Sequence, residues 1–491
     1  MPPRQLRPLC VALALAGLAA CEESSDPTPV TQTLSAAGAQ ARSTRYVVTF
    51  KSGVPNGFDL RVAALGGKVS LRDEVLGFAA VSGLSEREAQ SLVRDGLAAT
   101  AEVEPVIQLS PAAIKKTAQS RAGAISSAAN PAAAFLFSVV PIQWDMLAVH
   151  ADAAWAAGKL GSSSVAVGIL DTGLDYTHPD LAGRVDLARS IDLVDEADSI
   201  AKYFGPGRHP ISDLNGHGSH VGTVVSSNAL LSAGITSLTT LVGVKVCTMR
   251  GRCPTASVLE GIRYAVDAGV SVINLSLGGS FPKSVGRGIG SIINGTINYA
   301  NRRGVLIVVA AGNSSANLDR DANAFQLYCS APHVVCVSGL GPTGEGAFGP
   351  FVNVDAFASF YSDYGRSAIG VAAPGGNVVL DGAGNLVDLT PVWSSCSLTA
   401  LDFGSLTPAA DDPVLGPLCP PQFLPAVGFI GTSEAAPHVT GLAASLAAQG
   451  VRGAARLRAA ILAGADDLGA RGTDPFYGKG RINVAASLGV H

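Results

Sequence analysis

The amino-acid sequence predicts an α/β protein: a large three-layer domain with a mainly parallel central sheet, preceded by a smaller α+β domain. Two observations predict the large domain. From residue 138 onward, short runs of Val, Ile, Leu and Ala end at small or polar residues, as do strands that are buried on both faces of a parallel sheet. Stretches with helical periodicity separate these runs, so strand and helix alternate along the chain.

Composition limits the classes of function. The chain has 491 residues, of which 47% are hydrophobic and 15% charged, which is typical of a globular protein with more than one domain. The formal net charge of -4 gives no reason to expect nucleic acid or an anionic membrane surface as a partner. No apolar run reaches the roughly 18 residues of a membrane span.

The N-terminal 44 residues are predicted to direct export rather than to fold. Residues 1–20 carry Arg4 and Arg7 before a short apolar run, the pattern of a signal peptide. The run ends in "LAAC", which resembles the lipobox of bacterial lipoproteins and makes Cys21 the lipidated residue. The alternative is ordinary signal cleavage that leaves Cys21 unmodified. Residues 21–44 are polar, as in a tether.

Cysteine parity favours lipidation. Of the eight cysteines, Cys10 leaves with the signal, and the remaining seven are an odd number for an exported chain. Lipidation of Cys21 leaves six, which an oxidising compartment would pair. The expected local pairs are Cys247 with Cys253, Cys329 with Cys336, and Cys396 with Cys419.

The smaller domain is predicted to span residues 45–110. Its expected elements are a strand in "RYVVTF", a helix in "FDLRVAALG", a strand pair in "KVSLRDEVLGFAAVSGL", a helix in "SEREAQSLVRDG" and a closing strand in "VEPVIQL". The second helix begins with a capping box of Ser85 and Glu88. Residues 111–137 are rich in Ala and Ser without a strong period, which predicts a linker that is cleaved during maturation.

In the domain at 138–491, strands are expected in "SVAVGILDTG", "LVGVKV", "VSVINLSLGG", "VLIVVAAGN" and "AIGVAAPGG", and helices in "ASVLEGIRYAVDAG" and "GSIINGTINYANRRG". Function in such sheets gathers at the carboxyl ends of the strands. The stretch from Gly376 to Val427 is rich in proline and is expected to be a long loop held by Cys396 and Cys419.

Candidate catalytic groups stand at strand and helix ends. Asp171 follows a strand, His217 lies between glycines in "NGHGSHVGT", and Ser433 precedes an Ala-rich helix. Together they suit nucleophilic serine catalysis, in which Ser433 attacks, His217 takes the proton and Asp171 orients the imidazole. The Ser433 N–H at the helix start and the Asn313 side chain are the expected oxyanion donors.

These segments resemble the subtilisin family of serine peptidases (subtilases). The resemblance rests on "LDTGLDYTHPDL", "DLNGHGSHVGT", "GVSVINLSLGG", "VVAAGN" and "GTSEAAPHVTG", in the family's Asp–His–Ser order. It implies a subtilisin-like fold, assigns Asp171, His217 and Ser433 to the triad and Asn313 to the oxyanion hole, and gives Ser276, Leu277 and Gly278 to substrate-backbone pairing. It further implies that residues 45–110 are a ferredoxin-like inhibitory propeptide.

Other polar residues near these motifs are predicted to be structural. His220 is expected to pack within its helix, His438 to point away from Ser433, and His178 to form a turn. Asp180 matches a position that ligates calcium in some relatives, but the loop "SNALLSAGITSLTT" offers few carboxylate oxygens. No cofactor is expected to be required for catalysis, no metal site is predicted, and structural calcium has no support in the sequence.

Glu434 departs from the family pattern, in which Met follows the serine; Ser219, in place of Thr, is a milder change. A carboxylate about 6 Å from the oxyanion would oppose it by about 3 kcal/mol at an effective dielectric constant of about 20. Two hypotheses follow for this modulating residue. Glu434 faces the leaving group and favours basic residues after the scissile bond, or a cation holds it and its charge is merely tolerated.

The sequence thus predicts an exported, monomeric serine endopeptidase that acts on peptides or proteins. It is made as a self-processing zymogen inhibited by its own propeptide, and only a lipid anchor would connect it to a membrane. Small residues in "AAGN" and "SLGG" predict a roomy, mainly apolar first substrate pocket. The alternative function is that of a degenerate, non-catalytic peptide-binding protein at the cell surface.

Overall fold

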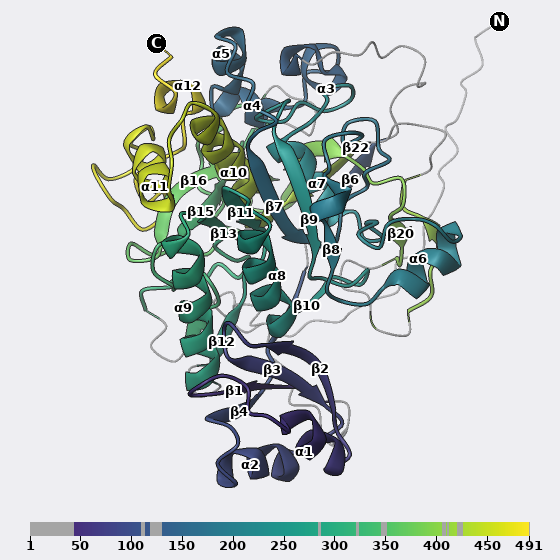
Figure 1. Cartoon of the computed structure of the whole chain (residues 1–491). Coiled ribbons are helices and arrows are strands. Elements are labelled where there is room, and N and C mark those ends of the chain that lie inside the picture. The colour runs from purple at the N-terminus through teal and green to yellow at the C-terminus, as the bar shows by residue number, and fades with distance from the viewer. Residues whose placement is uncertain are drawn as a thin grey trace, which may run out of the picture.

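A seven-stranded sheet, parallel between every pair of neighbours, forms the centre of the protein (Figure 1). The structure is a computed structural model that describes residues 44–109, 113–117, 130–282, 286–320, 324–344, 351–404, 409, 412–419 and 426–490. In spatial order the strands are β16 (Ile369–Pro374), β15 (Val335–Leu340), β13 (Leu306–Ala310), β11 (Val272–Leu275), β7 (Ala166–Asp171), β9 (Thr240–Lys245) and β8 (Ile191–Asp192).

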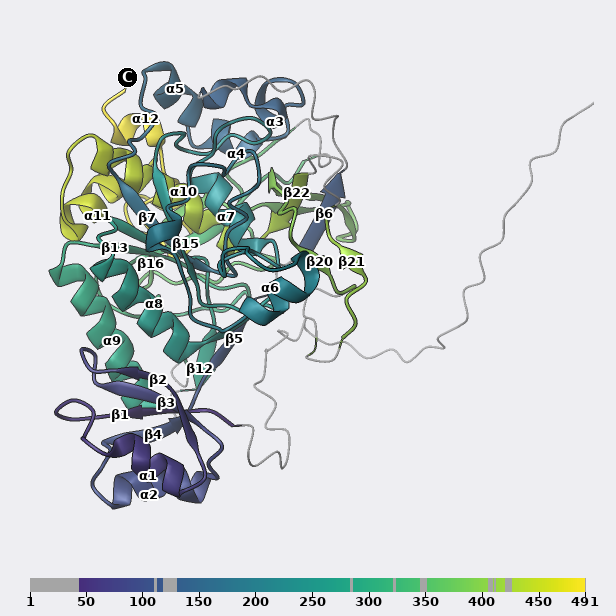
Figure 2. The same cartoon turned by 45° about the vertical axis from the view of Figure 1, so that its right-hand side comes forward.

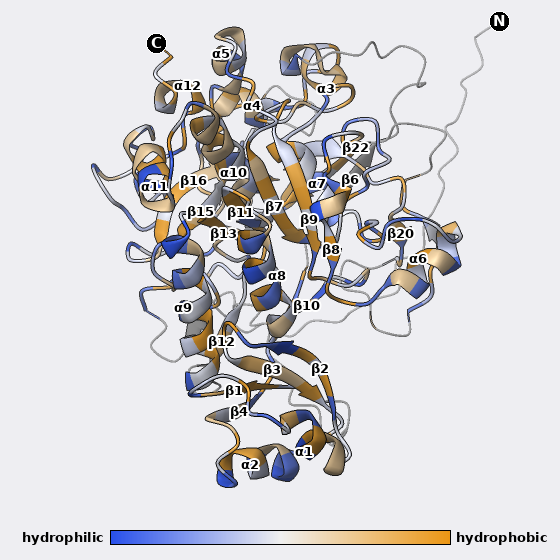
Figure 3. Ribbon diagram, in the orientation of Figure 1, coloured by the Kyte–Doolittle hydropathy of each residue, from blue (hydrophilic) through white to orange (hydrophobic). Residues whose placement is uncertain are grey.

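Five of these strands, β7, β9, β11, β13 and β16, coincide with the predicted apolar runs. Both faces of each strand are buried because successive side chains point to opposite helical layers. In β7, Val167 and Ile169 join one hydrophobic cluster, whereas Ala166 and Leu170 join the other. Figure 3 shows the sheet as a largely hydrophobic band between the helices.

Helices cover both faces of this sheet, which confirms the predicted three-layer α/β arrangement. One layer contains α7 (His217–Val225), α10 (Thr432–Ala448) and α11 (Ala454–Ala463), and the other contains α8 (Thr255–Asp267) and α9 (Arg287–Arg302). The peripheral helices are α3 (Phe135–Ser138), α4 (Trp144–Ala148), α5 (Ala151–Ala156), α6 (Ala197–Phe204) and α12 (Val484–Ser487).

The N-terminal unit, residues 45–104, forms the predicted α+β structure. Its order is β1 (Tyr46–Thr49), α1 (Phe58–Ala64), β2 (Lys68–Asp73), β3 (Phe78–Ser82), α2 (Glu86–Arg94) and β4 (Thr100–Val103), with an antiparallel sheet in the spatial order β2-β3-β1-β4. This is the ferredoxin-like arrangement. The capping box predicted for Ser85 and Glu88 is present at the start of α2.

The strand predicted in "VEPVIQL" divides in two at Pro105. Proline has no N–H to donate to a ladder; β4 ends before it, and β5 (Val106–Gln108) leaves the N-terminal unit. There β5 pairs antiparallel with β10 (Arg252–Pro254), which immediately precedes α8. Figure 2 shows β5 leading from the N-terminal unit toward the large domain.

Two further predictions need correction. The expected linker at 111–137 contains β6 (Ala113–Thr117), which pairs antiparallel with β22 (Ala426–Ile430), itself paired with β19 (Val392–Ser395). The expected loop from Gly376 contains the hairpin of β17 (Asn377–Leu380) and β18 (Leu386–Thr390), and also β20 (Leu401–Asp402) and β21 (Gly416–Pro417). Backbone hydrogen bonds to neighbouring strands stabilise these segments. Their side chains do not alternate between apolar and polar residues, so the strands could not be predicted from the sequence pattern.

The remaining pair of strands, β12 (Ser280–Pro282) and β14 (Ala324–Gln326), is antiparallel. The three predicted disulfides, Cys247–Cys253, Cys329–Cys336 and Cys396–Cys419, are present. Cys21 and the rest of the predicted signal and tether lie outside the described residues. None of the helices in the described part of the chain combines the length and apolar character that a membrane span requires.

Candidate active site

Asp171 and His217 meet at the carboxyl edge of the central sheet. Asp171 is the last residue of β7, and His217 is the first residue of α7. The Asp171 Oδ1 and His217 Nδ1 atoms are 2.7 Å apart, and both side chains are almost fully buried, with exposures of 0% and 3%. Asp171 Oδ1 also accepts the N–H of Thr172 at 2.7 Å, which orients the carboxylate toward the imidazole.

Close backbone packing brings His217 to this position. Gly216, just before α7, has a φ of 100°, which L side chains rarely adopt. A Cβ on Gly218 would overlap the carbonyl oxygen of Gly173. The start of α7 is also held by Asp213, a fully buried carboxylate that sequence analysis did not single out. It accepts N–H donors from Gly216 and Ser219 at 2.8 Å and hydroxyl donors from Thr172 and Ser219 at 2.8 and 2.7 Å.

Ser433 is the second residue of α10, and Gly431 alone separates this helix from β22. Its N–H is one of the first in the helix, which have no intrahelical acceptor. The Ser433 hydroxyl donates to the carbonyl oxygen of Ser276 at 3.0 Å, and the Ser276 hydroxyl donates to the Ser433 carbonyl oxygen at 2.6 Å. In this state the Ser433 hydroxyl faces Ser276 and makes no hydrogen bond with His217.

Asn313 follows β13 and lies beside the start of α10. Its Oδ1 atom accepts the N–H and the hydroxyl of Thr432, both at 2.9 Å. This fixes the amide so that Nδ2 lies against Gly431, where a Cβ would be only 3.0 Å from it. The structure therefore brings an amide donor, Asn313 Nδ2, next to the helix start that carries Ser433.

Glu434 lies inside this constellation. Its side chain has no exposure to solvent, and its Oε1 atom is 3.9 Å from His217 Nε2. Its Oε2 atom faces Gly431, where a Cβ would lie 2.9 Å from it. Sequence reasoning left two surroundings open for this carboxylate, a leaving group or an unseen cation; in the structure the group that it faces is His217.

Burial and charge act in opposite directions on these side chains. Burial lowers the pKa of His217, but the carboxylates of Asp171 and Glu434 outweigh burial and raise this pKa to about 9. Burial raises the pKa of Glu434 to about 7, although the attraction of His217 lowers it. The site is therefore rich in negative charge, and it favours a protonated imidazole.

His220 and His438 have the structural surroundings expected of them. His220 is fully buried, contacts the ring of Phe429 at 4.6 Å, and has a pKa that burial lowers to about 3. His438 contacts Asp145 Oδ2 at 3.0 Å through Nε2 and the Glu434 carbonyl oxygen at 2.8 Å through Nδ1. It therefore joins α4 to α10 and does not face Ser433.

Asp180, which the family resemblance matches to a calcium ligand of some relatives, has a shell of hydrogen-bond donors. Its Oδ1 atom accepts the N–H groups of Leu230 and Leu231 at 2.8 and 3.0 Å, and Oδ2 accepts the N–H of Ser232 at 3.0 Å and the hydroxyl of Ser395 at 2.5 Å. N–H groups repel a cation, and calcium requires six to eight oxygen ligands. The residues around Asp180 do not fit a calcium ion.

The segment predicted to pair with substrate, Ser276–Gly278, follows β11. A Cβ on Gly278 would lie 2.8 Å from the backbone of Gly312, so this residue permits close packing beside Asn313. The strand that pairs with the tail of the N-terminal unit is β10, which sequence analysis missed. A disulfide joins Cys253 of β10 to Cys247, whose N–H donates to the Asp171 carbonyl oxygen at 3.1 Å.

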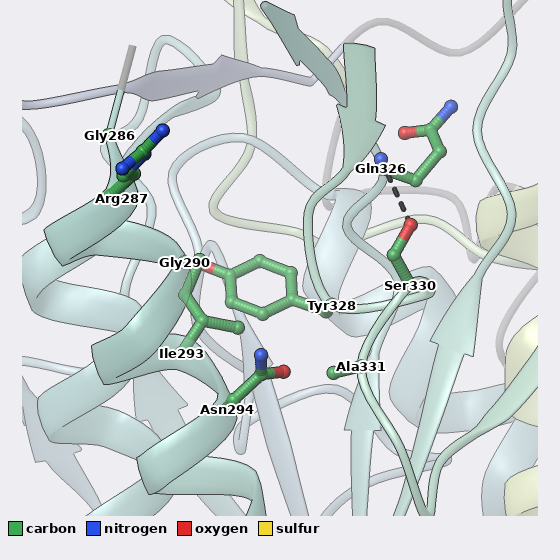
Figure 4. Close-up of a pocket in the computed structure, with 9 residues that line it drawn as sticks. All are labelled: Gly286, Arg287, Gly290, Ile293, Asn294, Gln326, Tyr328, Ser330 and Ala331. Atoms are coloured by element: carbon green, nitrogen blue, oxygen red, sulfur yellow. Dashed lines mark hydrogen bonds between the residues drawn. The ribbon is translucent and has the colours of Figure 1, made fainter. Parts of the chain in front are cut away.

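A cavity of about 470 Å³ lies between α9 and the loop after β14 (Figure 4). The Tyr328 ring lies across it, and the N–H of Gln326 donates to the hydroxyl of Ser330 at 3.2 Å on one side. None of the predicted catalytic residues lines this cavity.

Comparisons with known proteins agree with this geometry. The model of the Subtilase family matches residues 162–480. The chain is 30% identical to the Thermophilic serine proteinase of Bacillus sp. (strain AK1) over 68% of this chain and 64% of the relative, slightly less than two thirds of the relative's length. It is also 30% identical to Thermitase of Thermoactinomyces vulgaris, over 68% of this chain and 92% of that protein.

A solved structure gives the same fold. The Epidermin Leader Peptide Processing Serine Protease (EpiP) from Staphylococcus aureus superposes with a TM-score of 0.64 at 18% identity, over 91% of this chain and 98% of that chain. At this identity the likeness concerns the fold. Together the comparisons confirm the fold class and the family resemblance predicted from the sequence.

The surroundings of Asp180 generate a prediction about metal dependence. A chelator such as EDTA should leave the Tm unchanged, because N–H groups and a hydroxyl already satisfy the carboxylate. Asp180→Ala should lower the free energy of unfolding by about 3–5 kcal/mol, because three N–H groups, two of them buried, lose their acceptor. Thermal unfolding with and without EDTA tests the first statement, and a drop in Tm of several degrees with EDTA would contradict it.

Proposed function

This chain belongs to the subtilase family, and from that premise we propose that it is a serine endopeptidase made as a self-processing precursor. The observation that carries the proposal is the convergence of Asp171, His217, Ser433 and Asn313 on the carboxyl edge of one parallel sheet. The rival function, a non-catalytic peptide-binding protein, has no need of this set of groups, and only the charge of Glu434 favours it.

The proposed reaction follows from the atoms available. The Ser433 hydroxyl turns from Ser276 toward His217, attacks the carbonyl carbon of the scissile peptide bond and gives its proton to Nε2. The resulting oxyanion accepts hydrogen bonds from Asn313 Nδ2 and the Ser433 N–H. His217 then protonates the departing amine, and water hydrolyses the acyl-enzyme by the same steps in reverse.

The N-terminal unit supports the precursor part of the proposal, because it is seated against the large domain. Its sheet turns Val47, Phe78 and Ala80 toward the hydrophobic cluster that contains α8 and α9. The intervening residues of β1 and β3, such as Val48 and Ala79, pack on the unit's own helices. One face of the sheet therefore packs against the large domain, as is required of an intramolecular inhibitor.

Two acidic residues of the unit cap helices of the large domain. Glu102 accepts the N–H groups of Gly288 and Ile289 at 3.0 and 2.9 Å at the start of α9. Glu104 accepts the Ala256 N–H at 2.7 Å at the start of α8, and Arg45 lies 3.0 Å from its other oxygen. Negative charge at a helix N-terminus is stabilising, so both contacts favour the bound unit.

The tail of the unit contacts the large domain at β10 and at Gly279, the residue after the predicted substrate-pairing segment. The Leu109 N–H donates to the Gly251 carbonyl oxygen at 2.7 Å, and the Ile107 side chain packs against Gly279. Beyond residues 110–112, β6 pairs with β22, and Ala113 lies opposite Ile430, three residues before Ser433. The residues before and after 110–112 therefore both pair with strands of the large domain, and we place the maturation cleavage between Leu109 and Ala113.

Export and membrane attachment are part of the proposal as the sequence predicted them, with Cys21 lipidated and the peptidase released when its propeptide is cut away. Labelling of growing cells with a fatty acid, in the parent and in Cys21→Ser, tests the anchor.

The preference for apolar residues in the first pocket also remains a prediction; Gln326 and Asp363, which hydrogen bond to each other behind Gly312, place polar groups nearby.

Self-cleavage tests the nucleophile. The chain from residue 21, carrying Cys21→Ser, should cut itself between Leu109 and Ala113, and Ser433→Ala should remain intact. Ser445→Ala is a matched control, because Ser445 is buried in the same helix, and it should cut like the parent. Intact mass and N-terminal sequencing read the products; cleavage of purified Ser433→Ala at the same bond would contradict the proposal.

Removal of the oxyanion donor should affect turnover more than binding. Asn313→Leu should lower kcat by about 10²–10³-fold with a nearly unchanged KM, the magnitude known for subtilisin itself. Thr432→Val removes the hydroxyl that orients Asn313 but keeps the donor, so its loss of kcat should be smaller. Steady-state kinetics on a chromogenic peptide measure both, and equal losses would argue against the assigned role of Asn313.

The helix caps predict how tightly the cleaved N-terminal unit stays bound. Glu102→Gln and Glu104→Gln should each weaken binding by about 0.5–2 kcal/mol, or roughly 2- to 30-fold in Kd. After self-cleavage, activity should therefore appear at a higher protein concentration on serial dilution of each variant. Glu86→Gln, on the exposed start of α2, is the control and should match the parent; the same dilution curve for all would contradict the capping argument.

A further inference from the structure

Glu434 is a buried carboxylate whose oxygens have no hydrogen-bond partner. Neither Oε1 nor Oε2 makes a hydrogen bond within the described part of the chain, and the side chain has no solvent exposure. A buried, unpaired carboxylate is costly, and proteins retain one where a nearby positive charge compensates it. The nearest such group is the imidazole of His217, 3.9 Å away.

The two nitrogens of His217 face two carboxylates. Nδ1 contacts Asp171 at 2.7 Å, and Nε2 faces Glu434 at 3.9 Å. A neutral imidazole has one N–H and a lone pair on the other nitrogen, whereas an imidazolium donates from both. With acceptors on both sides, the arrangement stabilises the imidazolium and opposes the neutral form that must take the Ser433 proton.

Other titratable groups around the pair do not cancel this effect. Asp213, at the start of α7, adds a further negative charge that favours a protonated His217. Tyr361 has a pKa that burial, and then the charge of Glu434, hold well above the ordinary value. His220, one turn along α7, has a pKa lowered by burial to about 3. None of these side chains supplies a cation that competes with His217 for Glu434.

On the premise that the proposed peptidase function is correct, we propose that Glu434 is a positioning residue for His217. Its charge keeps a proton on Nε2, and the triad of the matured enzyme becomes active only in the alkaline range. The proton of His217 must leave before Ser433 can be deprotonated, and Glu434 sets the pH at which it leaves. This role is distinct from both sequence-based hypotheses, which concerned the leaving group and an external cation.

The direction of the pH effect follows from the two ionisations. Below pH of about 7 Glu434 is protonated, and above it the carboxylate is charged beside His217, whose pKa is about 9. Between these values the charged pair is complete, and His217 cannot act as a base. As the pH rises through about 9, His217 becomes neutral and kcat/KM should rise with it.

The first test measures the titration of His217 directly and does not require activity. In the intact chain with Ser433→Ala, NMR of the imidazole should give a titration midpoint near pH 9. Adding Glu434→Gln, which keeps the size of the side chain, should lower the midpoint by at least about one pH unit. Adding Glu434→Met should do the same without the N–H that glutamine offers to Nε2.

A midpoint near the ordinary histidine value of about 6.5 in the Ser433→Ala chain would by itself overturn the proposal, whether or not the Glu434 variants fold. The same midpoint in all three proteins would also overturn it. Asp381→Asn is the control for loss of one negative charge, because Asp381 lies in the exposed turn between β17 and β18, and it should leave the midpoint unchanged.

The second test uses the matured enzyme. The acid limb of the kcat/KM profile should lie near pH 9 in the parent and at least about one unit lower in Glu434→Gln, which means on the order of a tenfold gain at pH 7. An active parent with the same limb in both proteins would refute the role of Glu434 alone. No activity in the parent at any pH, with a His217 midpoint near 9, would refute the peptidase function and keep the charge pairing.

Discussion

The attraction between negative groups and the N-termini of helices organises this protein. The first N–H groups of a helix have no partner within it, and its dipole adds a partial positive charge. At α7 these groups are met by Asp213, at α8 by Glu104 and at α9 by Glu102. At α10 the carboxylate in the first turn belongs to Glu434. Four helices thus begin beside a carboxylate, and the last of them also carries Ser433.

This pattern connects inhibition with catalysis. The N-terminal unit supplies the carboxylates at α8 and α9, and the chain that follows it pairs with β10 through β5 and with β22 through β6. The start of α10 is the place where a reacting oxyanion would lie, beside Asn313 Nδ2. Glu434 Oε2 faces the same Gly431 as this donor. The negative charge of Glu434 and the negative charge of the reacting oxyanion would therefore lie close together. Asp171 and Glu434 also stabilise the protonated form of His217, whose imidazole lies between them.

Most of the central sheet could be predicted from the sequence, because strands that are buried on both faces are continuous runs of apolar residues. The runs behind β7, β9, β11, β13 and β16 were identified, and the motifs at their ends contain Asp171, His217, Asn313 and Ser433. Strands β6 and β10 were not identified, because backbone pairing with distant segments stabilises them and leaves no period in the side chains; β5 was predicted, but as one strand with the end of β4. The role of Asp213 at the start of α7 and the position of Glu434 beside His217 were missed. Burial and contacts between residues that are distant in the sequence arise only when the chain folds.

The central claim is that Ser433 is a nucleophile activated by His217 within this charged site. The most direct measurement is the rate at which a fluorophosphonate labels the matured enzyme across the pH range from about 6 to 10, with the labelled peptide identified by mass spectrometry. We expect labelling at Ser433 alone, at a rate that rises through pH of about 9, where His217 loses its proton. Labelling at another residue, or none in a folded and fully processed protein, would contradict it.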